Sequence, residues 1–250
     1  MTQIVGFTGR KRAGKDTACN FILAVKLAEL GVSKSTRLSS QGFIEVTDVL
    51  DDKVQGEDWF PFRSPYVDTD SLFNDRLGDS IRVYAFAKKL KDLSVDLFGL
   101  DRDLVFGTDK DKNTKTDFKW QDMPTATKNK GKMSIRELLQ YLGTDLFREM
   151  YTNIWVDSCI SQIKCDAPDL ALISDVRFEN EVLAIQEAGG YVVGLSRCKD
   201  ASDSHDSETS VEKCMSLCDA VIDNSALTIP EQNEQIYFTT KHLNIFPDMG

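Results

Sequence analysis

The sequence predicts an α/β fold with three layers, in which a parallel sheet lies between two layers of helices. Three observations favour this class. Short apolar runs alternate with stretches of helical spacing along most of the chain. The run at 170–174 is apolar almost throughout, which is typical of a parallel strand buried on both faces. The first run, which begins at Ile4, passes directly into a glycine-framed loop and then into a helix. In such sheets, ligands bind at the carboxyl ends of the strands.

The loop after the first strand has the pattern of a phosphate-binding loop, G-x-x-x-x-G-K between a strand and a helix. Its glycines let backbone N–H groups turn inward around a phosphate. The helix adds its positive end, and the lysine adds a mobile cation for the β- and γ-phosphates. A chance glycine turn is the alternative, and the combination of strand, spacing, lysine and helix disfavours it. We expect ATP to be bound by Gly9, Arg12, Ala13, Gly14, Lys15 and Thr17.

One position of this loop departs from the usual pattern. The residue after Lys15 is normally Ser or Thr, which binds Mg²⁺, but here it is Asp16, and the hydroxyl follows at Thr17. A carboxylate is a good ligand for a hard cation, yet it also repels the phosphates beside it. Two interpretations stay open for Asp16: a metal ligand, directly or through water, or a group that faces the attacking substrate. Lys15 and Asp16 are therefore candidate catalytic residues, and Asp16 and Thr17 are candidate metal ligands.

Length and composition limit the classes of function. The 250 residues suffice for one sizeable domain that carries insertions. The net charge of −10 disfavours a general nucleic-acid partner, because phosphate backbones attract basic surfaces. No apolar run approaches the thickness of a bilayer, and the N-terminus lacks a signal-peptide pattern. We therefore expect a cytoplasmic protein with no membrane partner.

Two stretches interrupt the regular pattern of the single domain, 1–250. Residues 33–78 are acidic and aromatic and show no sustained periodicity apart from a short strand at 42–46. We interpret them as an insertion. Its aromatic residues are expected to pack against the rest of the domain rather than to bind a base. Residues 109–132 are rich in charges and poor in apolar residues. They predict a mobile loop, which is either a solvated linker or a lid that closes basic groups over phosphates.

The remaining elements follow from local patterns. Ser134 is followed three residues later by Glu137, which is the capping box of a helix that carries Arg136 in its first turn. Gly143–Asp145 should interrupt that helix before a further amphipathic stretch. We expect strands at 81–86, 170–174, 191–195 and 220–223, and helices at 88–98, 182–188 and from Pro230.

The apolar strand at 170–174 leads into three polar residues that suggest a second substrate. Asp175 resembles the acid that holds Mg²⁺ in many nucleotide-binding folds, but Arg177 and Glu181 follow within one helical turn. This arrangement indicates that the three residues contact a second ligand beside the phosphate loop.

The basic residues favour phosphoryl transfer to a phosphate. Such transfer depends on positioning and charge neutralisation more than on covalent chemistry. Lys15 and Arg136 are candidates to hold the moving group, and Arg177 and Lys91 to hold an acceptor phosphate. An acceptor that is already anionic needs little general-base help, so these cations favour a phosphate-bearing acceptor over an alcohol.

The chain resembles the phage deoxynucleoside monophosphate kinases, which are P-loop enzymes that pass phosphate from ATP to dNMPs. The likeness lies in G-R-K-R-A-G-K-D-T at 9–17, in 86–91 leading into Phe98-Gly99, in 134–145 with Trp155, and in S-D-V-R-F-E-N-E at 174–181. The segment 204–208 is a weaker match. Together these segments cover most of the chain outside 33–78.

The resemblance implies a P-loop kinase fold and an ATP- and Mg²⁺-dependent enzyme that makes dNDPs for phage DNA synthesis in the host cytoplasm, as a homodimer. Lys112 falls where some members have an arginine, whose two-pronged contact a lysine cannot make. Trp155 either stacks on the base or lies in the core, and the loop of His205 would lie near the adenine or the rim of the site. By this resemblance the dNMP site comprises Lys91, Lys112, Arg136, Gly143, Thr144, Trp155, Asp175, Arg177 and Glu181.

Two other functions remain as alternatives. One is another small-molecule P-loop kinase, for example one that acts on dephospho-coenzyme A. The other is a nucleotide-binding switch without a second substrate. The sequence lacks the guanine-reading N-K-x-D motif of GTPases, and a second group of cations has no purpose without a second anion.

Overall fold

The computed structural model describes residues 2–49, 59–62, 80–124, 130–197 and 206–246. It divides into two compact units, the first formed by Met1–Tyr84 with Gln162–Gly250 and the second by Ala85–Ser161. Each unit is described by itself. Within the described ranges, no helix combines the length and the apolar character that a membrane span requires.

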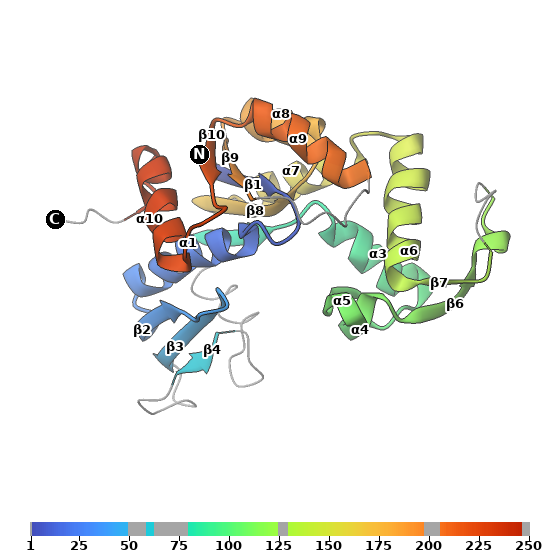
Figure 1. Cartoon of the computed structure of the whole chain (residues 1–250), viewed down its shortest axis with the longest axis horizontal. Helices are drawn as coiled ribbons and strands as arrows, with labels where there is room; N and C mark the ends of the chain where they lie inside the picture. The colour runs from blue at the N-terminus through green and yellow to red at the C-terminus, as the bar shows by residue number, and fades with distance from the viewer. Residues whose placement is uncertain (1, 50–58, 63–79, 125–129, 198–205, 247–250) are drawn as a thin grey trace. The chain divides into compact units, whose positions relative to one another are not determined.

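The first unit is built on a five-stranded sheet with the order β10-β9-β1-β8-β5, in which every pair of neighbours is parallel (Figure 1). The predicted α/β class is therefore confirmed. In the order of the sheet, the strands are β10 (Ala220–Asp223), β9 (Tyr191–Ser196), β1 (Gln3–Gly9), β8 (Leu170–Val176) and β5 (Ile81–Tyr84).

Helices cover both faces of this sheet, as in a three-layer P-loop kinase-like fold (Figure 1). Helix α1 (Lys15–Glu29) packs with α10 (Ile229–Thr240) on one face, and α8 (Glu179–Glu187) packs with α9 (Asp206–Leu217) on the other. The core under α1 includes Phe7, Ile22 and Leu172, each fully buried. Burial of one such side chain contributes about 1.5–3 kcal/mol relative to exposure.

An antiparallel hairpin forms most of the described part of the stretch 33–78. Strand β2 (Ser33–Leu38) pairs with β3 (Ile44–Val49), and β4 (Phe60–Pro61) adds to β3. The sequence indicated only a strand at 42–46, because β2 reads S-K-S-T-R-L and has almost no apolar alternation. Residues 50–58 and 63–79 lie outside the described part of the chain.

The second unit is mainly helical. Its first elements are α3 (Lys88–Phe98), α4 (Arg102–Phe106) and α5 (Asp109–Lys112), followed by the short helix η2 (Trp120–Asp122) between the antiparallel strands β6 (Lys115–Lys119) and β7 (Lys132–Ser134). Helix α6 (Ile135–Gln140) continues into the π-helical stretch η3 (Tyr141–Arg148), and α7 (Ile154–Asp166) follows.

Two expectations about this unit are corrected. The described part of 109–132 is a helical turn and a β-hairpin, rather than a loop without regular structure, because its charges lie on exposed edges and Thr116 and Met133 are buried between them. Residues 125–129 lie outside the description. Gly143–Asp145 does not end the preceding helix but widens it into a π-helix, a local form that is frequent at functional sites.

Candidate active site

The loop between β1 and α1 adopts a conformation that depends on its glycines. Gly9 has φ +154° and Gly14, which precedes the first residue of α1, has φ +97°. A Cβ at Gly9 would lie 2.5 Å from the carbonyl oxygen of Leu195, so backbone from β9 fills the space of a side chain there. Arg12 also has a positive φ, +62°. The two framing glycines of the phosphate-loop pattern are thus required by conformation and by close approach.

Three side chains from distant parts of the chain hold the carbonyl groups of this loop. Asn224 Nδ2 donates to the carbonyl oxygen of Ala13 at 2.8 Å, and Gln232 Nε2 donates to that of Gly14 at 3.2 Å. Arg197 Nη1 donates to the carbonyl oxygen of Arg12 at 2.8 Å. Carbonyl oxygens that face these donors do not face a bound anion and repel it, which favours N–H groups on the inner side of the loop. Sequence reasoning missed Arg197, Asn224 and Gln232, because no local motif marks them.

Lys15 is buried and lies along the loop that precedes it. Its Nζ donates to the carbonyl oxygens of Gly9 at 2.6 Å and of Arg10 at 2.8 Å. The loop therefore holds the ammonium group at the position where β1 ends and α1 begins. A cation held at a helix N-terminus is suited to a phosphate ligand.

A cavity of about 730 Å³ opens at this loop. Residues 12–17 form one part of its wall, and the others come from Asn20, from the β2–β3 turn at 40–43 and from Arg197, Asn224, residues 227–230 and Gln232. Asp16 is exposed and Thr17 half-buried, and both line the cavity. A carboxylate and a hydroxyl fit Mg²⁺, which usually takes one or two protein oxygens and completes its shell with phosphates and water.

The residues after β8 lie at the same edge of the sheet as the phosphate loop, because β1 and β8 are parallel and Thr8 pairs with Val176. Asp175 and Arg177 are half-buried there. None of the described residues 175–181 lines the cavity at the phosphate loop.

Glu181, predicted to contact the second substrate, holds the backbone at the start of α8. Its side chain is buried, with 2% exposed, and Oε2 accepts hydrogen bonds from the backbone N–H groups of Arg177 at 2.7 Å and Phe178 at 3.1 Å. These contacts cap the start of α8. Glu181 is therefore a residue that positions the backbone of Arg177.

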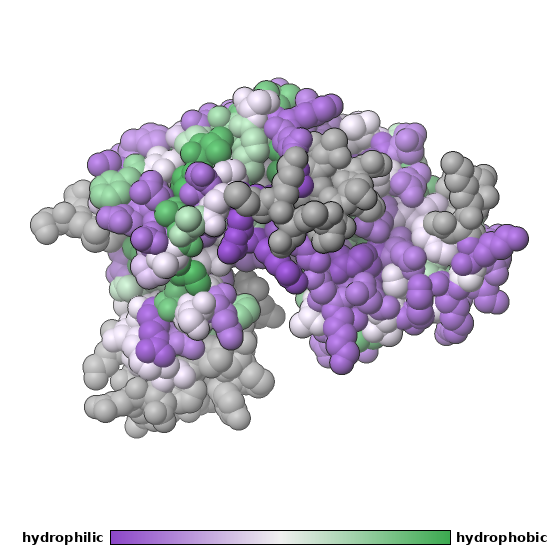
Figure 2. Space-filling view, viewed as in Figure 1, coloured by the Kyte–Doolittle hydropathy of each residue, from purple (hydrophilic) through white to green (hydrophobic). Residues whose placement is uncertain are grey.

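In the second unit, three basic side chains converge. Lys112, at the end of α5, is half-buried, and its pKa is lowered from the ordinary value by burial and then by the positive charges of Lys91 and Arg136. The shift shows that these three predicted substrate residues lie within electrostatic range of one another. Lys91 Nζ also lies 5.3 Å from the centre of the Phe106 ring. The surface over α4 and α5 is predominantly hydrophilic (Figure 2).

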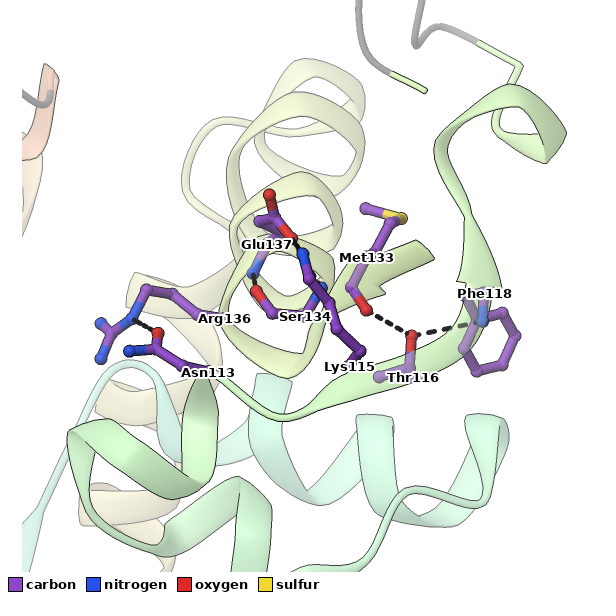
Figure 3. Close-up of polar contacts among 8 residues, drawn as sticks. All are labelled: Asn113, Lys115, Thr116, Phe118, Met133, Ser134, Arg136 and Glu137. Carbon is purple, nitrogen blue, oxygen red and sulfur yellow. Dashed lines mark hydrogen bonds and ion pairs between the residues drawn. The ribbon is translucent and has the colours of Figure 1, made fainter. Parts of the chain in front are cut away.

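The start of α6 determines where Arg136 lies (Figure 3). Ser134 Oγ accepts from the Glu137 N–H at 3.2 Å, and Glu137 Oε2 accepts from the Ser134 N–H at 2.6 Å, so the predicted capping box is confirmed. Arg136 follows the cap and donates to Asn113 Oδ1 at 3.3 Å and to Asp109 Oδ1 at 2.5 Å. Both partners belong to α5 or its C-terminal end, next to Lys112.

Gly143, Thr144 and Trp155 are brought together within the second unit. A Cβ at Gly143 would lie 2.6 Å from Leu90 Cδ2, so glycine at this position lets the π-helical stretch lie close to the Leu90 side chain of α3. Trp155 is buried, donates from Nε1 to the Gly143 carbonyl oxygen at 3.0 Å, and packs edge-on against Phe147. Of the two interpretations of Trp155, the structure favours the core residue. Thr144 is exposed beside it. The predicted loop residues 204 and 205 lie outside the described part of the chain.

Comparison with known proteins gives two matches. The family model described as deoxynucleotide monophosphate kinase matches residues 82–232, which is more than half of the chain. A protein of Acanthamoeba polyphaga mimivirus, provisionally named a deoxynucleotide monophosphate kinase, is 32% identical over 182 residues that cover 66% of this chain and 85% of that protein. The phosphate loop, the parallel sheet and these matches agree, and the chain belongs to the deoxynucleotide monophosphate kinase family, a family of phosphotransferases.

Proposed function

We propose that this protein transfers the γ-phosphoryl group of ATP to deoxynucleoside monophosphates and releases ADP and deoxynucleoside diphosphates, which serve phage DNA synthesis. The observation that carries the proposal is a group of three basic residues in the second unit: Arg136 donates to Asp109 and Asn113 of the α5 segment that carries Lys112, and the charges of Lys91 and Arg136 both act on Lys112. A group of neighbouring cations, one of them half-buried, is stabilised by a bound anion. A nucleoside monophosphate supplies that anion.

The phosphate loop supports ATP as the donor. The loop carbonyls are held by Arg197, Asn224 and Gln232, and Lys15 lies at the start of α1, where a polyphosphate would meet N–H groups and an ammonium group together. Asp16 and Thr17 would hold Mg²⁺ through their side-chain oxygens, and the ion would supply positive charge against the polyphosphate.

The chain's own residues contribute mainly by orientation and charge. Lys15 holds the γ-phosphoryl group while its bond to the β-phosphate oxygen breaks and negative charge gathers on ADP. Lys91, Lys112 and Arg136 orient the acceptor phosphate, one of whose oxygens forms the new bond to phosphorus. That oxygen already carries negative charge, so no residue is needed as a general base.

A coupled assay for ADP with separation of the products tests the proposal. ATP, Mg²⁺ and each dNMP in turn should give ADP and the matching dNDP in equal amounts. Lys15→Met should lower kcat/KM by about 100-fold or more, as expected when a group that stabilises transition-state charge is lost. Lys26→Met is the matched control, because Lys26 lies in the last turn of the same helix and pairs with Glu29.

Three results would contradict the proposal. The first is full turnover by Lys15→Met. The second is ADP formation that no dNMP stimulates, as expected of a nucleotide-binding switch. The third is phosphorylation of dephospho-coenzyme A in place of the dNMPs, which would indicate another small-molecule kinase.

A further inference from the structure

The turn between β2 and β3 shares a cavity with the phosphate loop. Ser40, Gln41, Gly42 and Phe43 line the same space as residues 12–17. This hairpin lies before residue 82, where the match to the family model begins. The family model therefore does not cover the part of the cavity wall that this hairpin forms.

The turn is anchored on α1. Asn20 Nδ2 donates to the carbonyl oxygen of Gly42 at 2.9 Å. Gly42 has φ +80°, and a Cβ there would lie 2.4 Å from Thr17 Oγ1, so only glycine allows this approach. Within the turn, Ser39 Oγ accepts from the Phe43 N–H at 3.1 Å. The turn is thus held against the first two turns of the helix that begins at Lys15.

Phe43 is exposed although it lies beside buried strand residues. Ile44 and Val46 point into the core, with 6% and 1% exposed, whereas Phe43 is 61% exposed. Strand alternation places Phe43 on the opposite face from Ile44, and the anchored turn holds it at the cavity. A large aromatic side chain presented in this way is available to a ligand.

The rest of the cavity wall suits a nucleobase. Leu227, Ile229 and Pro230 provide apolar surface. Asn224 also lines the cavity, and its Nδ2 donates to the carbonyl oxygen of Ala13 and to Gln232 Oε1. The apolar surface matches the flat face of a base.

The spacing along α1 agrees with this assignment. Asn20 follows Lys15 by five positions, which is about 7.5 Å along a helix axis, so the anchor of the turn lies more than one helical turn away from the lysine that would meet the terminal phosphates. We propose that the β2–β3 turn forms one wall of the donor-nucleotide site and that Phe43 packs on the donor's base. This inference rests on the proposed function, since it extends the same donor site from the phosphates to the base.

Calorimetric titration of the full-length protein with ATP and with inorganic tripolyphosphate tests the inference. Phe43→Ala should weaken the binding of ATP by about 5- to 100-fold, the range expected for loss of one base–aromatic contact. Binding of tripolyphosphate, which has no base, should not change. Phe43→Trp should keep the affinity for ATP. Phe238→Ala is the matched control, because Phe238 is 51% exposed and lies on α10 outside the cavity wall.

Several outcomes would overturn the inference. These are an unchanged affinity of Phe43→Ala for ATP, an equal loss of affinity for ATP and tripolyphosphate, and a wild-type protein that binds tripolyphosphate as tightly as ATP. A wild-type protein that binds no ATP would overturn both the inference and the proposed function. A wild-type protein whose affinity for ATP depends on Phe43, but which phosphorylates no dNMP, would support the inference and overturn the proposed function.

Discussion

At the scale of single residues, the two sets of cations have different surroundings. Lys15 is buried, but two backbone carbonyls accept its hydrogen bonds. Lys112 is half-buried near Lys91 and Arg136, and its pKa is lowered by burial and by both charges. Asp109 pairs with Arg136 and offsets part of this repulsion. We therefore expect a bound anion to stabilise the group of Lys91, Lys112 and Arg136 more than it stabilises Lys15.

Lys112→Met should bind dNMP less tightly and make the folded protein more stable. Loss of the charge removes one contact to the acceptor phosphate, and we expect KM for dNMP to rise about tenfold, equivalent to about 1.4 kcal/mol. The same loss removes repulsion from Lys91 and Arg136, so the midpoint of urea unfolding should rise at pH 7. Lys110→Met, an exposed position in the same helix, is the control and should change neither value.

The pH dependence of this effect has a definite sign. The pKa of Lys112 is lowered in the folded state from an ordinary value of 10.5, so between the folded-state pKa and 10.5 the unfolded chain binds more protons at this site. The destabilisation is fully present below the folded-state pKa and disappears as the pH rises toward 10.5. Urea unfolding of wild type and Lys112→Met should therefore converge as the pH rises through this range. A constant difference would contradict the assignment.

At the scale of elements, helix caps fix the backbone next to two candidate site residues, Arg177 and Arg136. Glu181 caps α8 through the N–H groups of Arg177 and Phe178, and Ser134 with Glu137 caps α6 directly before Arg136. Because each cap fixes the first turn of its helix, a change in the cap moves the basic side chain beside it. A cap can therefore affect substrate binding without contact to the substrate.

Ser134→Ala should lower both stability and dNMP affinity. Loss of an N-cap side chain costs about 1 kcal/mol of folding free energy, which urea unfolding would measure. Without the cap, the first turn of α6 is held less firmly. KM for dNMP should therefore also rise, because Arg136 lies in that turn and its position becomes less fixed. Asp101→Ala removes the N-cap of α4, where Asp101 accepts from Asp103 N–H, and should lower stability without a change in KM. Equal KM values for both variants would show that the cap does not position Arg136.

At the scale of the whole molecule, the proposed donor and acceptor groups belong to different compact units. The phosphate loop and its cavity belong to the first, and Lys91, Lys112 and Arg136 belong to the second. A ligand stabilises the part of the protein to which it binds by mass action. Each nucleotide should therefore report on its own set of residues during thermal unfolding.

ATP should raise the midpoint of thermal unfolding of the wild type and much less that of Lys15→Met. At a concentration 100 times Kd, a ligand adds about 2.7 kcal/mol to the stability of the state that binds it. Differential scanning calorimetry with ATP and Mg²⁺, and separately with dNMP alone, would measure the two shifts. The dNMP shift should persist in Lys15→Met and fall in Lys112→Met. The reverse pattern would mean that donor and acceptor residues have been exchanged.

Local patterns were enough to predict the α/β class, the two framing glycines and the capping box of α6. A buried parallel strand is apolar throughout, a phosphate loop needs glycine where φ is positive, and a capping box needs Ser and Glu three positions apart. The structure bears out each of these at residues 170–173 of β8, Gly14 and Ser134. The glycines and the capping box are decided within a few neighbouring residues, and the class follows from the order of such local patterns along the chain, so the sequence by itself determined them.

Only the tertiary structure decided the roles that depend on distant contacts. Asn224 and Gln232 hold carbonyls of a loop more than 200 positions earlier in the chain. Glu181 has the spacing of a substrate reader but is buried as a cap, and Trp155 is buried against Gly143. No local pattern separates these roles, because burial and partners follow from packing between segments far apart in the sequence.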